Sequence, residues 1–177
     1  MNKQNSNRTF RNTITITALL MLAATVFGLS KAHANHLLEP QTLSNCRTAT
    51  TEQHPLVEYE TTMALLEKLE FDEAVYCFYR GQLRYRIHLA ARPDLDPSAD
   101  PALFGSLNGF IGAMVNGHAQ SDLPSLVETI AEVLKWHESS NDLFTPKDQF
   151  PEAHEQQREG LKRLQEKFAE SADSSQD

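Results

Sequence analysis

Apolar side chains recur at helical spacing along most of this chain, whereas strict alternation of apolar and polar residues never extends past a few positions. The pattern predicts five helices, at about 55–69, 72–91, 101–115, 123–138 and 151–170. Pro55 and Pro151 open the first and the last of them, and Asp122 or Ser121 caps the fourth. We therefore expect an all-α fold, a compact bundle of five helices joined by short connections.

The third predicted helix is the weakest, because Gly105, Gly109 and Gly112 each disfavour a helix by up to ~1 kcal/mol relative to alanine. Their spacing of four and three residues would form a smooth face against a neighbouring helix. The pair Asn116-Gly117 predicts the turn that ends this helix.

The second predicted helix is apolar on two opposite sides. One side holds Val75, Tyr76, Tyr79, Leu83, Ile87 and Ala90, and the other holds Ala74, Phe78, Gly81, Tyr85 and Leu89. Two narrow polar seams separate them, with Glu73, Arg80 and Arg84 on one and Gln82 and Arg86 on the other. A helix with two apolar sides packs between neighbours, so we expect 72–91 to be the central helix.

The start of this helix, Phe71-Asp72-Glu73-Ala74-x-x-x-Phe78-x-x-Gly81, resembles the second half of a tetratricopeptide or Sel1-like repeat. In those repeats the small and aromatic positions pack two antiparallel helices. The resemblance covers about 25 of the 177 residues, and no second copy follows at a 34-residue period. It implies one helical hairpin and binding of a protein or peptide, and ordinary antiparallel packing explains the same residues.

Residues 1–34 have the parts of a secretory signal peptide. Residues 1–12 are basic, 13–29 are uncharged and mostly apolar, and Ala32 and Ala34 occupy positions −3 and −1 of a cleavage site. The alternative is an uncleaved anchor, although the apolar stretch is at the short end of the ~20 residues that a span requires. We expect cleavage, a Gram-negative periplasmic location and no membrane insertion afterwards.

Three parts are expected to follow the signal peptide. Residues 35–54 are polar and predict an extended N-terminal segment, residues 55–170 form the helical domain, and residues 171–177 form a disordered tail. Cys46 and Cys77 make an even count, which in an oxidising compartment favours a disulfide. The alternative is a pair of buried free thiols.

The charge of the chain argues against nucleic acid as a partner. Twenty-four acidic and 16 basic residues give a net charge of −8, which becomes −12 without residues 1–34, since these carry four bases and no acid. Nucleic-acid binding requires a basic surface. His137 lies near the C-terminus of the fourth predicted helix, where a cation is favourable, and we interpret it as a structural residue.

Basic residues nevertheless concentrate on the second predicted helix. Arginine binds carboxylates and other anions bidentately, and tyrosine adds a hydroxyl and a stacking face. The candidate binding surface consists of Tyr76, Arg80, Arg84, Arg86 and Arg92. The alternative is internal pairing of these arginines with acidic residues, or surface arginines stacked on tyrosines.

No motif for catalysis or for a metal is complete. Residues 154–158 depart from H-E-x-x-H because Arg158 replaces the second histidine. Residues 94–100 resemble the start of a calcium loop, but Ala99 and Gly105 stand where glycine and glutamate are required. There is no G-x-S-x-G, C-x-x-C or phosphate loop. We therefore expect no catalytic residue, metal site or cofactor.

These observations favour a non-enzymatic periplasmic protein that binds another envelope protein or peptide through Arg80–Arg92 and residues 101–118. A more specific alternative is an immunity protein against an envelope-targeted toxin, because an acidic surface steers onto a basic partner. A third is an envelope protein that binds a small anionic ligand through the arginine and tyrosine side chains.

Overall fold

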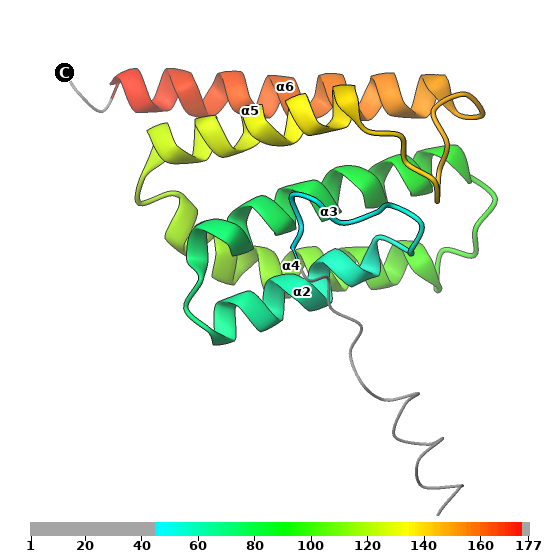
Figure 1. The fold of residues 1–177 in the computed structure, drawn as a ribbon, viewed down its shortest axis with the longest axis horizontal. Helices are drawn as coiled ribbons and strands as arrows, with labels where there is room; N and C mark the ends of the chain where they lie inside the picture. The colour runs from blue at the N-terminus through cyan, green and yellow to red at the C-terminus, as the bar shows by residue number, and fades with distance from the viewer. Residues whose placement is uncertain (1–44, 175–177) are drawn as a thin grey trace, which may run out of the picture. The chain divides into compact units, whose positions relative to one another are not determined.

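The regular structure of residues 45–174, the part of the chain that this computed structural model describes, is entirely helical (Figure 1). The helices are α2 (Leu56–Glu67), α3 (Phe71–Ala91), α4 (Asp100–Ala119), α5 (Leu123–Ser139) and α6 (Pro151–Ser174). The predicted all-α bundle of five helices is therefore confirmed. The signal peptide predicted at 1–34 lies outside the described residues, as do 35–44 and 175–177. None of the described helices has an apolar stretch long enough to cross a bilayer.

Helix α3 is the central element, as its two apolar sides predict. In Figure 1 it lies between the antiparallel pair α5 and α6 on one side and α2 with α4 on the other, and it packs against all four. Side chains from both of its apolar sides are buried, among them Ala74, Val75, Phe78, Tyr79, Leu83, Tyr85 and Ile87. The core of the bundle is therefore built around α3.

Helices α2 and α3 form a hairpin whose turn has the geometry of a Schellman motif. The N–H of Glu70 donates to the carbonyl of Leu65 at 3.0 Å, and the N–H of Leu69 donates to that of Leu66 at 3.1 Å. Leu69 has a φ of 62° and its side chain is 71% exposed. A left-handed conformation of this kind favours glycine, so the turn carries a local conformational cost.

Gly81 allows α2 and α3 to approach closely. A Cβ atom at this position would lie 2.6 Å from the Cβ of Glu58, a distance that requires the backbones to separate. Close packing of two antiparallel helices at a small residue is also what the resemblance to a helical repeat implies.

Cys46 and Cys77 form the predicted disulfide. It attaches the non-helical residues 45–54 to the middle of α3, which this segment crosses in Figure 1. Both cysteines are buried, with exposed fractions of 3% and 0%. The disulfide therefore holds the segment against the core.

The turn predicted at Asn116-Gly117 is wrong, because α4 continues to Ala119. Val115 and Ala119 are buried, and the hydroxyl of Tyr79 donates to Oδ1 of Asn116 at 3.0 Å. Packing on α3 therefore keeps this stretch helical against its local turn preference.

The ends of the last two helices show one agreement and one difference. Asp122 caps α5 as predicted, since its Oδ1 accepts a hydrogen bond from the N–H of Ser125 at 3.0 Å. The tail predicted from residue 171 is helical as far as Ser174. The Oγ of Ser171 donates to the carbonyl of Lys167 at 2.9 Å, a bond that fits a continued helix.

The glycines of α4 do not form one packing face. A Cβ at Gly112 would lie 3.1 Å from Cζ of Phe78, so this glycine packs closely on α3. Gly105 and Gly109 are exposed and have no neighbouring atom within 4 Å of such a Cβ. The predicted smooth face is therefore divided between the core and the surface.

Candidate functional site

The five residues of the predicted binding surface do not share one surface. Arg80 and Arg84 are 0% and 1% exposed, and Tyr76 is 2% exposed beneath the guanidinium of Arg47, 4.1 Å from its ring centroid. Arg86 is exposed and lines a cavity between α3 and α6. Arg92 is half-buried at the end of α3. Only Arg86 therefore offers its charge at an open site.

Arg84 is held inside the bundle by two acidic side chains. Its Nε and Nη2 donate to the two carboxylate oxygens of Asp142, at 3.0 and 3.2 Å, and its Nη1 donates to Oε1 of Glu58 at 2.6 Å. Nη2 also donates to the carbonyls of Thr51 and Gln53, at 2.9 and 2.8 Å. Although burial works to lower it, Glu58 and Asp142 together raise the pKa of Arg84 above its usual value.

Arg80 lies on the same side of α3, one turn before Arg84. Its Nη1 and Nη2 donate to the carbonyls of Cys46 and Ala49, and its guanidinium stacks on Trp136, 4.4 Å from the ring centroid. The Nη2 also lies 3.5 Å from Oε1 of Glu58. Both arginines thus bind the segment that precedes α2, and internal pairing, the alternative for these two residues, is what the structure shows.

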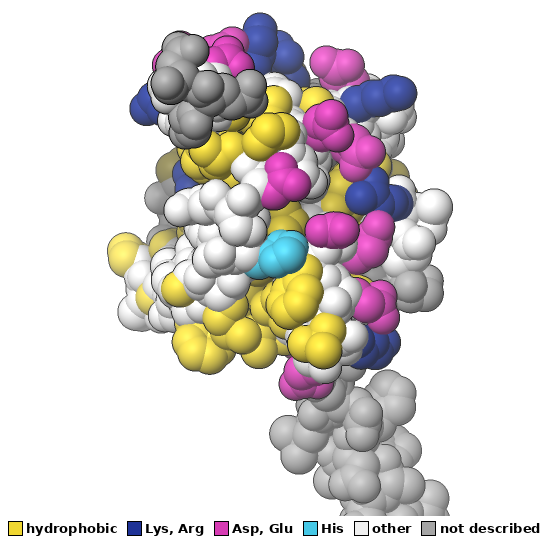
Figure 2. Space-filling model, turned by 90° about the vertical axis from the view of Figure 1, so that its left-hand side faces the viewer, with side chains coloured by type: hydrophobic (Ala, Val, Ile, Leu, Met, Phe, Trp, Pro, Cys, Tyr) yellow, Lys and Arg dark blue, Asp and Glu magenta, His cyan; other side chains and the backbone are white. Residues whose placement is uncertain are grey.

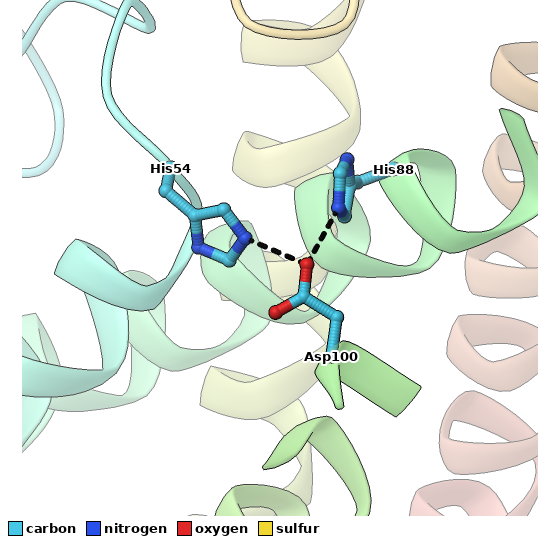
Figure 3. A group of neighbouring side chains, drawn as sticks. All are labelled: His54, His88 and Asp100. Atoms are coloured by element: carbon cyan, nitrogen blue, oxygen red, sulfur yellow. Dashed lines mark hydrogen bonds and ion pairs between the residues drawn. The ribbon is translucent and has the colours of Figure 1, made fainter. Parts of the chain in front are cut away.

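A second polar cluster joins three parts of the fold, and Figure 3 shows its rings converging on one carboxylate. Oδ2 of Asp100, the first residue of α4, lies 3.2 Å from Nε2 of His54 and 2.9 Å from Nε2 of His88. Its Oδ1 accepts a hydrogen bond from the hydroxyl of Tyr85 at 3.1 Å. These contacts lower the pKa of Asp100 although partial burial works to raise it, so the carboxylate stays ionised.

The neighbours of the two histidines assign their protons. A guanidinium only donates, so Nη1 of Arg92, 2.9 Å from Nδ1 of His88, requires that nitrogen to accept. The N–H of Leu56 imposes the same role on Nδ1 of His54, at 3.1 Å. In the neutral form, each ring therefore carries its proton on Nε2 and donates it to Asp100.

This arrangement limits the chemistry of the cluster. His54, His88 and Asp100 have ligand atoms within 4.8 Å of one another, as a zinc or similar ion requires. However, a histidine that binds a metal through Nε2 carries its proton on Nδ1 and donates it outward, whereas both Nδ1 atoms here face donors. The same donors occupy the lone pairs that a general base would use. The cluster is therefore suited to joining residue 54, α3 and α4.

Comparison of the chain with protein families, with curated proteins and with solved structures gives no match.

His137 and His154 form a buried pair that no pattern in the sequence indicates. Nε2 of His154 donates to the carbonyl of Thr145 at 2.7 Å, so its Nδ1 accepts from Nε2 of His137 at 2.9 Å. Burial, together with Lys147, lowers the pKa of His137 to about 4. His137 is therefore neutral although the C-terminus of α5 favours a cation, because desolvation outweighs the helix dipole.

The buried partners of Arg80 and Arg84 carried little signal in the sequence. Glu58 lies within the predicted first helix, and Asp142 lies in the polar stretch between the fourth and fifth predicted helices. Asp100 stands in the sequence only as part of an incomplete calcium-loop pattern, yet its carboxylate binds His54, His88 and Tyr85. Each pairing joins residues far apart in the chain, and no local spacing indicates it.

Proposed function

We propose that the protein acts by non-catalytic binding of another envelope protein through the exposed face of α4. The observation that carries the proposal is the apolar, uncharged character of this face. Leu103, Phe110 and Met114 are 39%, 66% and 45% exposed. Between Pro101 and Ala119 the helix has no Asp, Glu, Lys or Arg, in a chain of net charge −8.

Small residues make this face accessible along its length. Ala102, Ser106, Gly109, Ala113 and Gly117 lie on the exposed side at intervals of three and four residues. Beside the larger apolar side chains they form a shallow surface on which a second helix packs at close range. A helix of 20 residues is about 30 Å long, which suits a partner of similar length.

Acidic residues flank the face at both ends. Asp94 and Asp96 precede α4, and Asp72 and Asp122 lie near its C-terminal end, where the carboxylate of Asp72 is 3.5 Å from the ring of His118. Figure 2, which views one end of the bundle, shows hydrophobic side chains gathered beside a band of acidic ones. The partner that fits is therefore an amphipathic helix with basic residues at its ends.

A second copy of the chain fits this face less well. Two antiparallel α4 helices would bring the acidic ends of both copies together, and like charges at a rim oppose association. A basic toxin helix is one partner of the required chemistry, which keeps an immunity role within the proposal.

The decisive test is the binding of two designed 18-residue helical peptides, identical except for lysine or glutamate at both ends. At low ionic strength we expect at least tenfold tighter binding of the lysine peptide by fluorescence anisotropy, and a smaller difference as salt is added. Phe110→Gln should weaken binding about tenfold, because one aromatic contact is lost.

Leu143→Gln is the matched control, since Leu143 is another exposed leucine, 50% accessible, outside α4. Equal binding of both peptides would overturn the proposal, as would an equal loss on Leu143→Gln. A dimer that Phe110→Gln disrupts would make a second copy the occupant instead.

Export is part of the proposal. A buried disulfide fits an oxidising compartment, and residues 1–34 have the pattern of a cleavable signal. Mass spectrometry of protein from a periplasmic extract should find Asn35 at the N-terminus. An intact chain in the membrane fraction would contradict this part.

A further inference from the structure

The groove between α3 and α6 contains a cavity of about 300 Å³. Its apolar floor consists of Leu83, Leu161 and Leu164, and the amides of Gln82 and Gln157 lie among its walls. The charged residues that line it are Arg86, Arg163 and Lys167, with no acidic residue. In a chain of net charge −8, this is a local concentration of positive charge around a hollow.

None of these three cations has an ion-pair partner among the described residues. Glu159 precedes Arg163 by one helical turn, but its carboxylate binds Arg158 at 2.8 Å. Arg163 and Lys167 are four residues apart on α6, a spacing at which like charges repel and weaken a helix. An anion in the cavity would relieve this repulsion.

Gly160 is an independent indication that the space is needed. It lies in the middle of a 24-residue helix, where glycine costs about 1 kcal/mol relative to alanine. A Cβ there would meet nothing closer than Nη2 of Arg163, at 3.8 Å, an ordinary contact. Packing within the protein therefore gives no reason for glycine, whereas the cavity, which Gly160 lines, gives one.

We infer that this cavity binds a small organic anion with two carboxylate groups. Arg86 lines the groove from α3, with its guanidinium carbon 5.6 Å from the ring centroid of Phe104, and Arg163 and Lys167 line it from α6, so both walls carry basic residues. Guanidinium groups bind carboxylates bidentately, and the leucine floor accommodates a short carbon chain. The volume is at the lower end for small-molecule sites. The site is separate from the face of α4, and it uses Arg86 alone of the five arginine and tyrosine residues singled out in the sequence.

Isothermal titration calorimetry at constant ionic strength tests the site with succinate, glutarate, inorganic phosphate and the neutral analogue succinamide. We expect binding of at least one dicarboxylate and none of succinamide. Arg86→Gln and Arg163→Gln should each weaken dicarboxylate binding about tenfold or more, because each removes a charged hydrogen-bond donor. Gly160→Leu should abolish binding by filling the cavity, with the helix content unchanged by circular dichroism.

Arg158→Gln is the control, because Arg158 lies on the same helix but pairs with Glu155 and Glu159 outside the cavity. It should change the affinity less than twofold. Absence of dicarboxylate binding would overturn the inference, and so would an equal loss in Arg158→Gln. Phosphate binding as tight as that of the dicarboxylates would overturn the assignment to an organic ligand.

Discussion

The guanidinium of Arg84 forms a bidentate ion pair with the carboxylate of Asp142. Its Nε donates to Oδ2 at 3.0 Å and its Nη2 donates to Oδ1 at 3.2 Å. Oδ1 of Asp142 also accepts from the N–H groups of Phe144 and Thr145, at 3.0 and 3.2 Å. One buried arginine thus connects the centre of α3 with the loop between α5 and α6. It also pairs with Glu58 of α2 and donates to the carbonyls of Thr51 and Gln53, in the segment that precedes α2.

Arg84→Met should therefore lower the free energy of unfolding by about 3–5 kcal/mol, since it leaves Glu58 and Asp142 buried without their partner. Urea unfolding followed by circular dichroism measures the change. Arg158→Met serves as a control, because Arg158 forms a solvent-screened pair with Glu155 and its loss should change the stability far less. Equal effects of the two substitutions would contradict a structural role for the buried cluster.

The sequence predicts the helices of this fold well and its polar contacts poorly, for different physical reasons. Apolar periodicity acts over one or two turns, so the two-sided pattern of α3 indicates its central position. The seam of Arg80 and Arg84 and the seam of Arg86 look equivalent in the sequence, yet one is buried and the other lines a cavity. What separates them is the path of residues 45–54, which the disulfide fixes and no local pattern shows.

The close contact of α2 and α3 at Gly81 gives a second prediction. Gly81→Ala should destabilise the fold by about 1–3 kcal/mol, because the added Cβ would lie 2.6 Å from that of Glu58. Gly117→Ala provides the contrast, since nothing lies within 4 Å of a Cβ there and alanine favours a helix by up to about 1 kcal/mol. Thermal unfolding should shift in opposite directions for the two variants, and a shift in the same direction would count against the hairpin geometry.

The left-handed conformation of Leu69 predicts a stabilising substitution. Leu69→Gly should raise the free energy of unfolding by about 1 kcal/mol, because glycine adopts a φ of 62° without the steric cost that leucine bears. Lys68→Gly is the control, since Lys68 has a φ of −87° and glycine there should stabilise nothing. Chemical denaturation of both variants decides the matter, and a loss of stability in Leu69→Gly would refute the turn geometry.

The disulfide should account for a large share of the stability. The bond joins residues 31 positions apart, and a closed loop of that size contributes about 3–4 kcal/mol on the chain-entropy model. A Cys46→Ala/Cys77→Ala variant should lose this amount and expose the segment that covers Arg80 to faster hydrogen exchange. Reduction of the wild-type protein should give the same loss, whereas unchanged stability in both cases would show that the segment is held without the bond.

Acid should weaken the fold in the range where its buried histidines resist protonation. Burial is the largest cause that lowers the pKa of His137, His154 and His88 below the ordinary 6.5, for His137 to about 4. Lys147 and Arg158 also disfavour a charge on His137, and Asp142 opposes them. In the unfolded chain these groups take up protons near pH 6.5, so stability is complete above that value and falls as the pH drops towards 4.

His137 alone should contribute about 3 kcal/mol to this fall, although the loss of carboxylate pairs adds to it at the lowest pH. His137→Gln keeps a donor for Nδ1 of His154 but does not titrate, so its stability should depend less steeply on pH between 6.5 and 4. Urea unfolding at half-unit intervals of pH measures both proteins, and parallel curves for wild type and His137→Gln would show that the histidine pair is not kept neutral in the folded state.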